Sequence, residues 1–232
     1  MSFERIRRRI TFPPDSVKEV QKLVEKQKIQ DPKIFSKFVG LHKGESFVVC
    51  GCGNSLKNYE SFDSHIAIGV NDASSRIPCK YLVVVNEPRN FARGRWENVE
   101  NTDAEYVFTH IPTLPIPNSE RRVIINLGKY EGVNLDNYGF IDYTTNSPYM
   151  AIIIAYQMGA RKIAIVGVDF TLHHFFGETG KHKINREIDK VLNQYSVLGR
   201  ALTDKGISIA NLSQESMIES WPKMTLEEFE TI

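Results

Sequence analysis

Two glycines follow a short apolar run in the order Gly51-Cys52-Gly53-Asn54-Ser55. Glycine permits positive φ angles and close backbone approach, so such a turn after a strand can bring backbone amides against a phosphate. A helix that begins near Ser55 would add its partly positive N-terminus. No Gly-Lys-Ser/Thr follows, which excludes a P-loop, and Leu56 replaces the third glycine of a dinucleotide fingerprint. The turn predicts a site for a nucleotide-type ligand, and the alternative is an ordinary strand-to-helix turn.

Polar residues occupy the ends of other apolar runs as well. Asn71 and Asp72 follow one run, Asn86 follows the next, residues 144–147 precede a long apolar helix, and residues 167–171 follow a later run. Any one of them is explained as a turn cap, but five such ends at one edge of a parallel sheet favour a polar small-molecule site. The candidate binding residues are Gly51, Cys52, Gly53, Asn54, Ser55, Asn71, Asn86, Thr145, Asn146, Ser147 and Thr171.

The segment 172–184 holds three histidines and two glycines, namely His173, His174, His182, Gly177 and Gly180. A glycine-containing loop after a strand end suits a substrate lid, and histidine is the natural general base. The candidate catalytic residues are His182, then His174, with Asp169 to orient a ligand hydroxyl or a histidine. Each histidine can equally be a surface loop residue, and Asp169 can simply cap its turn. No metal site is expected, because no two histidines have the i, i+4 spacing that places ligands on one helix face.

Three arginines follow Asn86 in a segment that also contains two aromatic residues: Arg89, Arg93, Arg95, Phe91 and Trp96. Guanidinium groups could clamp an anionic sugar or a phosphate. A solvated helix face is the favoured interpretation.

Seven short apolar runs predict strands, and several are apolar throughout, as in strands that are covered on both faces. They are residues 47–50, 66–70, 81–85, 106–109, 123–125, 163–166 and 207–210. Helices are predicted at residues 147–158 and at about 186–203, each followed by a glycine, Gly159 and Gly206. Strands that alternate with helices imply right-handed parallel crossovers. The expected fold is α/β, a single Rossmann-like, doubly wound and mainly parallel sheet over residues 45–232.

Residues 1–44 form a separate basic segment before this domain. Residues 1–43 carry eleven Lys and Arg against five Asp and Glu, so their net charge is +6 and that of the remainder is −5. Asp15-Ser16 gives an N-cap signal, and apolar residues then recur at helical spacing until Asp31-Pro32, which predicts an N-terminal amphipathic helix. The favoured interpretation of the charge is a solvated helix, and an anionic membrane or nucleic-acid surface is the minor alternative.

The composition is that of a globular protein. Of the 232 residues 41% are apolar and 25% are charged, and the net charge of +1 gives no reason to expect nucleic acid as a partner. No apolar run reaches the ~18 residues of a membrane span, and three cysteines fit a reducing compartment. We therefore expect a cytoplasmic protein, with the basic N-terminus as a candidate for peripheral contact with the inner membrane face. The C-x-C spacing of Cys50 and Cys52 does not suit a structural zinc.

The order of these motifs resembles the bacterial sialyltransferases of glycosyltransferase family 42. Those enzymes have a Gly-x-Gly-Pro-Ser-Leu turn, an Asn after each of the next two strands, a Thr-Ser-Gly-x-x-Met helix start and a Gly-Ile-Asp-Phe strand end. The matching parts here are residues 50–56, Asn71, Asn86, residues 145–150 and residues 166–170. The resemblance spans about residues 46 to 216 and excludes the N-terminal helix. The pterin diphosphokinase-like proteins share the Gly-Pro-Ser-Leu turn and the same broad fold.

The resemblance implies a variant GT-A domain, often oligomeric, that binds a CMP-activated sugar as co-substrate and needs no metal. It implies nucleotide contacts from Gly51, Gly53, Ser55, Asn71, Asn86, Thr145 and Asn146. It also implies a base histidine in the loop before the last helix, where His182 lies. Uncharged donors can hold phosphate and ribose, aided by the free amides of a helix that begins near Ser147.

Several positions depart from the family pattern. Cys52 stands where the family has Asn, Asn54 where it has Pro, and Asn146 and Ser147 where it has Ser and Gly. The tyrosine pair with which those enzymes grip the departing phosphate has no match in residues 171–176. The expected function is metal-independent transfer of a CMP-linked acidic sugar to a glycan or lipid-linked acceptor. The alternatives are a diphosphokinase-like phosphoryl transferase and a non-catalytic nucleotide or sugar-phosphate binding module.

Overall fold

The structure is a computed structural model, and it describes residues 33–60, 63–92, 94–171, 173–178 and 186–232. Residues Lys33–Ile232 form one compact unit. The predicted N-terminal amphipathic helix, Arg93 and His182 lie outside the described residues. Phe35 and Phe38, which precede residue 45, are buried in the core of this unit.

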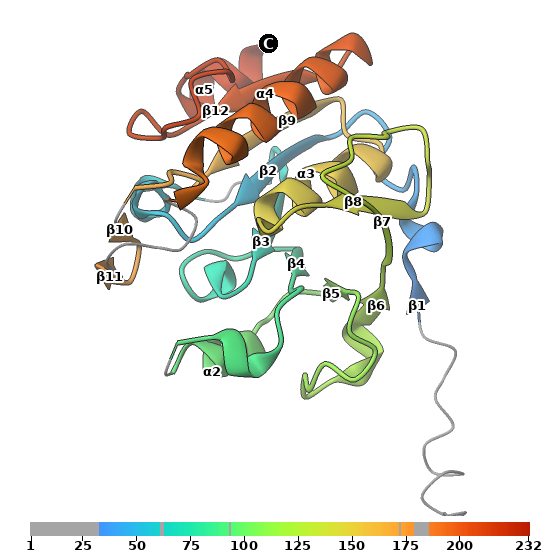
Figure 1. Cartoon of the computed structure of the whole chain (residues 1–232). Coiled ribbons are helices and arrows are strands. Elements are labelled where there is room, and N and C mark those ends of the chain that lie inside the picture. The colour runs from blue at the N-terminus through green and yellow to red at the C-terminus, as the bar shows by residue number, and fades with distance from the viewer. Residues whose placement is uncertain (1–32, 61–62, 93, 172, 179–185) are drawn as a thin grey trace, which may run out of the picture. The chain divides into compact units, whose positions relative to one another are not determined.

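Eight strands form one sheet in the order β1-β6-β5-β4-β3-β2-β9-β12, and all neighbouring pairs are parallel (Figure 1). Val49 of β2 lies opposite Ile68 of β3 and Ile165 of β9. The seven predicted strands are confirmed, with ends that differ by at most two residues, and β1 is additional. Their bounds are β1 Lys33–Ile34, β2 Ser46–Cys50, β3 Ile66–Val70, β4 Tyr81–Val83, β5 Tyr106–Thr109, β6 Arg122–Ile124, β9 Lys162–Val166 and β12 Ser208–Asn211.

Alternate residues of the central strands enter hydrophobic layers on opposite faces of the sheet. Phe47 and Val49 pack in the layer that contains the apolar residues of α3 (Ser147–Gln157) and α4 (Ile188–Asp204). Val48 packs in the opposite layer with Phe229 of α5 (Leu226–Thr231), and α2 (Arg95–Glu100) adds Val99 to a third cluster. Helices therefore cover both faces, as a doubly wound sheet requires. No helix in the described part of the chain is long and apolar enough to span a membrane.

The two long helices follow from their sequences in different ways. α3 is buried on almost all sides, because it contacts β2 and β3 of the sheet and also β8 (Phe140–Tyr143), a strand outside this sheet. Pro148 lies in the first turn of α3, where the missing backbone N–H of proline costs no intrahelical hydrogen bond. α4 is amphipathic, with Val191, Tyr195 and Leu198 buried at helical spacing. Trp221, near the C-terminus, is buried and donates its indole N–H to the carbonyl oxygen of Tyr195 at 3.0 Å.

Local structure departs from the prediction at the first turn. The helix expected near Ser55 is a short 3-10 helix, η2 (Asn54–Asn58), because the Leu56 amide bonds the Gly53 carbonyl three residues earlier. Two small strand pairs were not predicted: the parallel pair β7 (Asn126–Tyr130) with β8 (Phe140–Tyr143), and the antiparallel pair β10 (His173–His174) with β11 (Gly177–Glu178). The remaining 3-10 helices are η1 Phe35–Phe38, η3 Ala73–Ser75, η4 Pro88–Asn90 and η5 Ser119–Arg121.

The order of the strands reverses next to β2. Strands β3 to β6 extend from β2 in sequence order on one side, and β9 and β12 lie on its other side. The boundary between β2 and β9 is therefore the topological switch point, where open α/β sheets bind ligands beyond the carboxyl ends of the strands. Residues 51–55 and 167–171 continue the chain at this point.

Candidate ligand-binding site

A cavity of about 220 Å³ opens at the carboxyl ends of the strands next to the switch point. Its walls come from the chain after β2, β3, β4 and β9, from the start of α3 and from β10. Ten of the candidate residues named from the sequence line it: Cys52, Gly53, Asn71, Asn86, Thr145, Asn146, Ser147, Asp169, Thr171 and His174. Strand ends that are far apart in the sequence thus meet around one hollow. Among the described candidates, Gly51, Asn54 and Ser55 do not line it.

The glycine-rich turn bonds to the protein's own backbone. Gly51 donates its amide to the carbonyl oxygen of Val166 at 2.8 Å, and Gly53 donates to that of Gly167 at 2.6 Å. A Cβ on Gly51 would lie 2.3 Å from the Gly167 oxygen, so the close approach of the ends of β2 and β9 requires glycine there. This corrects the expectation that these amides face a phosphate: the pairing of β2 with β9 continues into the turn and occupies them.

Ser55 and Asp169 fasten this turn to the end of β9. Asp169 is buried, and its two carboxylate oxygens accept hydrogen bonds from the Ser55 amide at 2.8 Å and the Ser55 hydroxyl at 2.7 Å. The Ser55 hydroxyl oxygen also accepts from the Gly167 amide at 2.8 Å. Both carboxylate oxygens therefore already have partners, so Asp169 positions the wall of the cavity. The same bonds account for the place of Ser55 behind this wall.

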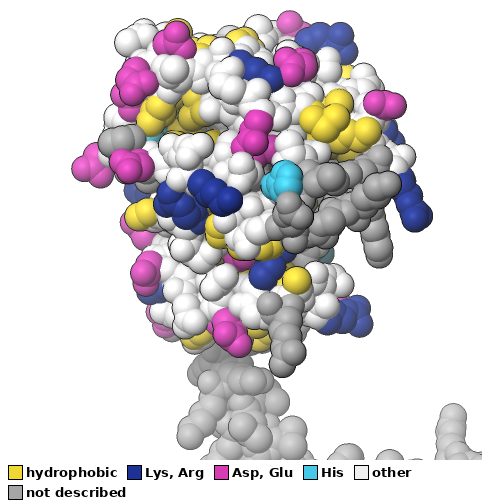
Figure 2. All heavy atoms as spheres, turned by 90° about the vertical axis from the view of Figure 1, so that its left-hand side faces the viewer, with side chains coloured by type: hydrophobic (Ala, Val, Ile, Leu, Met, Phe, Trp, Pro, Cys, Tyr) yellow, Lys and Arg dark blue, Asp and Glu magenta, His cyan; other side chains and the backbone are white. Residues whose placement is uncertain are grey.

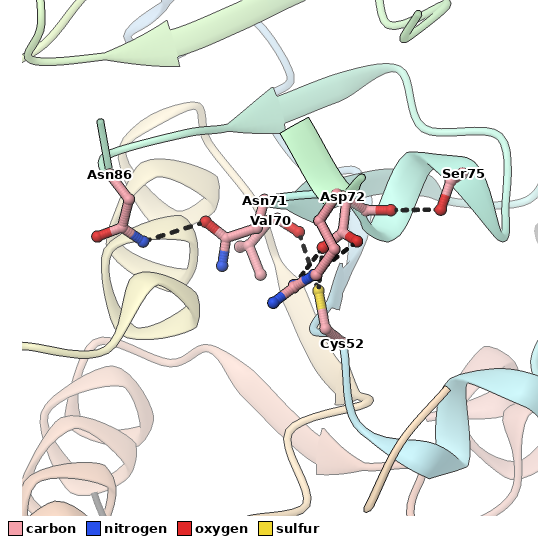
Figure 3. Close-up of polar contacts among 7 residues, drawn as sticks. Cys52, Val70, Asn71, Asp72, Ser75 and Asn86 are labelled. Atoms are coloured by element: carbon pink, nitrogen blue, oxygen red, sulfur yellow. Dashed lines mark hydrogen bonds and ion pairs between the residues drawn. The ribbon is translucent and has the colours of Figure 1, made fainter. Parts of the chain in front are cut away.

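Asn71 and Asn86 form an amide pair at the ends of β3 and β4 (Figure 3). The Asn86 amide nitrogen donates to the Asn71 side-chain oxygen at 3.3 Å. The other polar atom of each amide makes no hydrogen bond within the described residues, and both residues line the cavity. Asn71 has a φ of +53°, a left-handed conformation that asparagine tolerates better than most residues, which turns the chain directly at the strand end. The pair therefore offers one uncharged donor and one acceptor to a ligand.

The start of α3 forms another wall of the cavity. Asn146 is the residue before the helix, and its side-chain oxygen accepts a hydrogen bond from the hydroxyl of Tyr195 in α4. Thr145 is exposed, whereas Ser147 is buried, and both line the cavity. The N-terminal turn of a helix carries amides without intrahelical partners and a partly positive charge. This wall therefore favours an anionic or strongly polar group.

Arg95 is the cationic side chain of the described cavity lining. It forms a bidentate ion pair with Asp72, in which its Nε lies 3.0 Å from one carboxylate oxygen. Its guanidinium lies over the Phe176 ring, 4.3 Å from the centroid. Burial alone would lower the pKa of Arg95, but the hydrogen bond and charge of Asp72 outweigh burial and raise it. The preference for a solvated helix face was therefore wrong for Arg95, because a side chain 23 residues earlier holds it at the cavity.

Cys52 shares the buried carboxylate of Asp72. Its thiol donates to an Asp72 oxygen at 3.4 Å and to the Val70 carbonyl at 3.5 Å (Figure 3). Burial is the main cause that raises the pKa of this thiol above its ordinary value. The negative charge of Asp72 raises the pKa further. Cys52 is therefore a neutral donor, not a nucleophile. Arg89, by contrast, is exposed and pairs with Glu87 at 2.6 Å.

The histidines of the described part of the loop lie on β10. His173 and His174 both line the cavity, and the His174 ring stacks on Phe176 with centroids 5.1 Å apart. The β10 segment is attached to the first turn, because Phe175 donates its amide to the Cys52 carbonyl at 3.1 Å. Within the described residues no group of three His, Cys, Asp or Glu could hold a metal ion.

The lining also contains apolar residues that were not among the predicted binding residues. Phe91 and Phe170 face the cavity together with the polar groups, and Phe170 has a φ of +58°. Both lie in segments that contain predicted site residues, but their residue type alone does not mark them as ligand contacts. The surface on the side of β10 and β11 carries interspersed basic and acidic side chains in its described part (Figure 2). A ligand therefore meets mixed charges there instead of a field of one sign.

The fold is similar to that of several solved structures at low sequence identity. The MAf glycosyltransferase from Magnetospirillum magneticum AMB-1 aligns with a TM-score of 0.50 and 11% identity, over 92% of this chain and 42% of that chain. The sialyltransferase CstII from Campylobacter jejuni in complex with the substrate analogue CMP-3FNeuAc gives 0.48 and 12%, over 80% and 88%. An alpha-2,3-sialyltransferase from Campylobacter jejuni in apo form gives 0.46 and 14%, over 80% and 82%.

At these identities the likeness is one of fold. This chain spans less than half the length of the Magnetospirillum protein. No protein-family model matches the sequence, and no curated protein matches it.

Proposed function

We propose that this protein is a metal-independent glycosyltransferase that binds a nucleotide-activated sugar in the cavity at the switch point. The proposed donor is a CMP-linked acidic sugar, and the proposed acceptor is a glycan or a lipid-linked sugar. The observation that carries the proposal is the gathering of Asn71, Asn86 and Asn146 from three chain segments around one hollow. A glycosyltransferase fold of the same kind supports it.

The cavity suits the parts of a sugar nucleotide. The free amide atoms of Asn71 and Asn86 can bind ribose hydroxyls or a base edge, as one donor and one acceptor. The start of α3 and Thr145 can hold the phosphate, which needs hydrogen-bond donors more than it needs a full positive charge. The ion pair with Asp72 holds the charged guanidinium of Arg95 at the cavity, where it can face the carboxylate of an acidic sugar.

Transfer requires a base on the acceptor side of the cavity. An acceptor hydroxyl oxygen attacks the anomeric carbon, the bond from that carbon to the phosphate oxygen breaks, and the hydroxyl proton passes to the base. We propose a histidine for this role. His182 is the first candidate from the sequence and lies outside the described residues. His174 is the second candidate, and it lines the cavity. If the His182→Ala protein binds CMP normally and turns over at the wild-type rate, His182 is not the base, and His174 becomes the candidate for this role.

One observation favours a non-catalytic binding module as the second candidate. The amides of Gly51 and Gly53 are used by the backbone, so the first turn contributes less to a leaving phosphate than the family pattern implies. Phosphate stabilisation would then depend on α3, Thr145 and Arg95.

Thermal unfolding in the presence of nucleotides tests the proposal. CMP, CDP, UDP, GDP and ATP would be added to the full chain with and without Mg²⁺. A ligand at a hundred times its dissociation constant stabilises the folded state by about 2.7 kcal/mol, so binding is readily visible. We expect CMP to raise the unfolding temperature without Mg²⁺, and Asn86→Ala to reduce the shift. Asn101→Ala is the matched control, because Asn101 is exposed and lies outside the cavity lining.

The other outcomes separate the alternatives. Stabilisation by ATP only with Mg²⁺ would favour a diphosphokinase-like enzyme, and no stabilisation by any nucleotide would sink the proposal. If CMP binds but a CMP-sugar is neither hydrolysed nor transferred, the protein is a non-catalytic binding module. Transfer would be followed by release of CMP from the CMP-sugar with a panel of saccharide acceptors.

A further inference from the structure

A second and larger cavity, of about 580 Å³, lies behind the wall that Ser55 and Asp169 form. It is lined by η2 and the residues that follow it, by the segment after β12 and by the start of α5. Asn54 and Ser55, which were expected at the nucleotide site, line this cavity instead. Its volume is in the range of small-molecule sites. Gly53 lines the first cavity and Asn54 the second, so one turn separates the two.

A buried hydroxyl in this cavity has no partner. Ser213 is 1% exposed, and its Oγ makes no hydrogen bond within the described residues. Buried polar side-chain atoms in proteins are in large majority hydrogen-bonded. The Ser213 backbone is held in place, because its amide donates to the side-chain oxygen of Asn211 at 3.1 Å. Ser213 thus carries an unused hydroxyl donor within the wall of the cavity, on a backbone that is held in place.

The charges of the lining select against anions. Three carboxylates line the cavity, those of Glu60, Glu215 and Glu227, and no Lys or Arg is among the described lining residues. All three are exposed, so they lie at the rim. The Glu215 carboxylate is already bonded to the Asn54 amide at 3.0 Å, which fixes its orientation. A phosphate or carboxylate ligand would be repelled at the mouth, whereas a hydroxyl group can donate to these oxygens.

The inner lining combines apolar and uncharged polar groups. Val166 and Leu212 supply apolar surface, and Leu226 lies beside them in the lining. The buried polar residues of the lining are Ser55, Tyr59 and Ser213. The hydroxyls of Ser55 and Tyr59 already have partners in Asp169 and His65, whereas that of Ser213 has none within the described residues. A saccharide ring matches such a lining, because it carries C–H surface on its faces and hydroxyl groups around its edge. We propose that the second cavity binds an uncharged saccharide, independently of the nucleotide site.

Titration of the full chain with neutral sugars tests this inference without any nucleotide. Binding of galactose, N-acetylglucosamine and lactose would be followed by ligand-observed NMR, with glucose 6-phosphate and glucosamine as charged comparators. We expect at least one neutral sugar to bind, glucose 6-phosphate to bind at least about tenfold more weakly, and glucosamine to bind no more tightly than the neutral sugars.

Two variants locate the binding. Ser213→Ala removes a hydroxyl without a partner, so the fold keeps its bonds, and it should weaken binding of the neutral sugar about three- to tenfold. Asn58→Trp places an indole on an exposed residue of the lining and should abolish binding. Ser216→Ala is the matched control, because this buried serine lies outside the lining and donates to the Val168 carbonyl at 2.8 Å. Asn86→Ala should leave sugar binding unchanged.

Several results would overturn the inference. Failure of all neutral sugars to bind, or equal binding of glucose 6-phosphate, would do so directly. Tighter binding of glucosamine would mark an ammonium site instead. Loss of sugar binding in Asn86→Ala, or its persistence in Asn58→Trp, would place the sugar outside the second cavity. None of these readouts depends on CMP binding, so the failure of this inference and the failure of the proposed function are distinguishable.

Discussion

Asp72 is fully buried, and Arg95 supplies the positive charge that balances it. The Asp72 side chain is 1% exposed and the Arg95 side chain 23%, so the pair is largely removed from water. Two charges of opposite sign in such a place interact strongly, but the cost of their desolvation offsets much of the gain. The value of the pair for function is the fixed position of a guanidinium at the cavity.

Removal of one partner should reveal the cost of an unpaired buried charge. We expect Arg95→Met to lower the free energy of unfolding by about 3–5 kcal/mol, because the carboxylate of Asp72 then stays buried without a partner. Urea unfolding measures this change. Asp72→Asn combined with Arg95→Met should be less destabilised than Arg95→Met alone, since both charges are gone. An Arg95→Met protein as stable as the wild type would contradict the assignment of a buried ion pair.

At the scale of elements, the turn after β2 serves packing before it serves binding. The ends of β2 and β9 approach so closely that the first glycine leaves no room for a side chain. Cys52 then contacts the Asp72 carboxylate, and Ser55 is fastened to Asp169, which follows the neighbouring strand β9. Ligand contact is left to the residues that remain on the inner side of the turn.

Substitution of the first glycine tests this account of the turn. A Cβ at Gly51 would meet backbone that cannot move without disturbing β9, so Gly51→Ala should cost about 3 kcal/mol or more. Gly94→Ala is the control for backbone strain alone, because Gly94 has a φ of +82° and open space around it. That strain should cost about 1–2 kcal/mol. Equal effects of the two substitutions in urea unfolding would show that the turn can relax.

At the scale of the whole molecule, the fold buries histidines that would titrate freely in an open chain. Burial lowers the pKa of His110, and its Nδ1 has no partner in the described structure. Burial also lowers the pKa of His65, although the nearby charge of Glu230 opposes the change. Protonation of either residue therefore favours the unfolded chain.

Stability should therefore decline on acidification. The unfolded chain takes up protons at these histidines below about pH 6.5, before the folded protein does. Their contribution to stability is thus complete above that pH and is lost as the pH falls below it toward their lowered folded pKa values. We expect the free energy of unfolding to fall between pH 7 and pH 5.5, and to fall less steeply in His110→Gln. Urea unfolding across this range measures both slopes, and equal slopes would remove His110 from the effect.

Most strands of the main sheet, its two long helices and the edge at which ligands are expected can be predicted from the sequence alone. The runs at Ile66–Val70 and Tyr106–Thr109 match the strands that the structure contains. The start of α3 at Ser147 also matches. Apolar periodicity is a local property, so a single chain carries it in full. The convergence of the strand ends follows from parallel crossovers alone.

Contacts between distant segments determine which groups at that edge remain free for a ligand. Ser55 and Asp169 are 114 residues apart, and their bonds occupy both carboxylate oxygens of Asp169 and hold Ser55 behind the wall of the first cavity. Arg95 reaches the cavity through Asp72, whereas Arg89 stays at the surface with Glu87. Such partners are set by distances between segments that folding brings together, and no local pattern encodes them. The division of the edge into two cavities by one turn has the same origin.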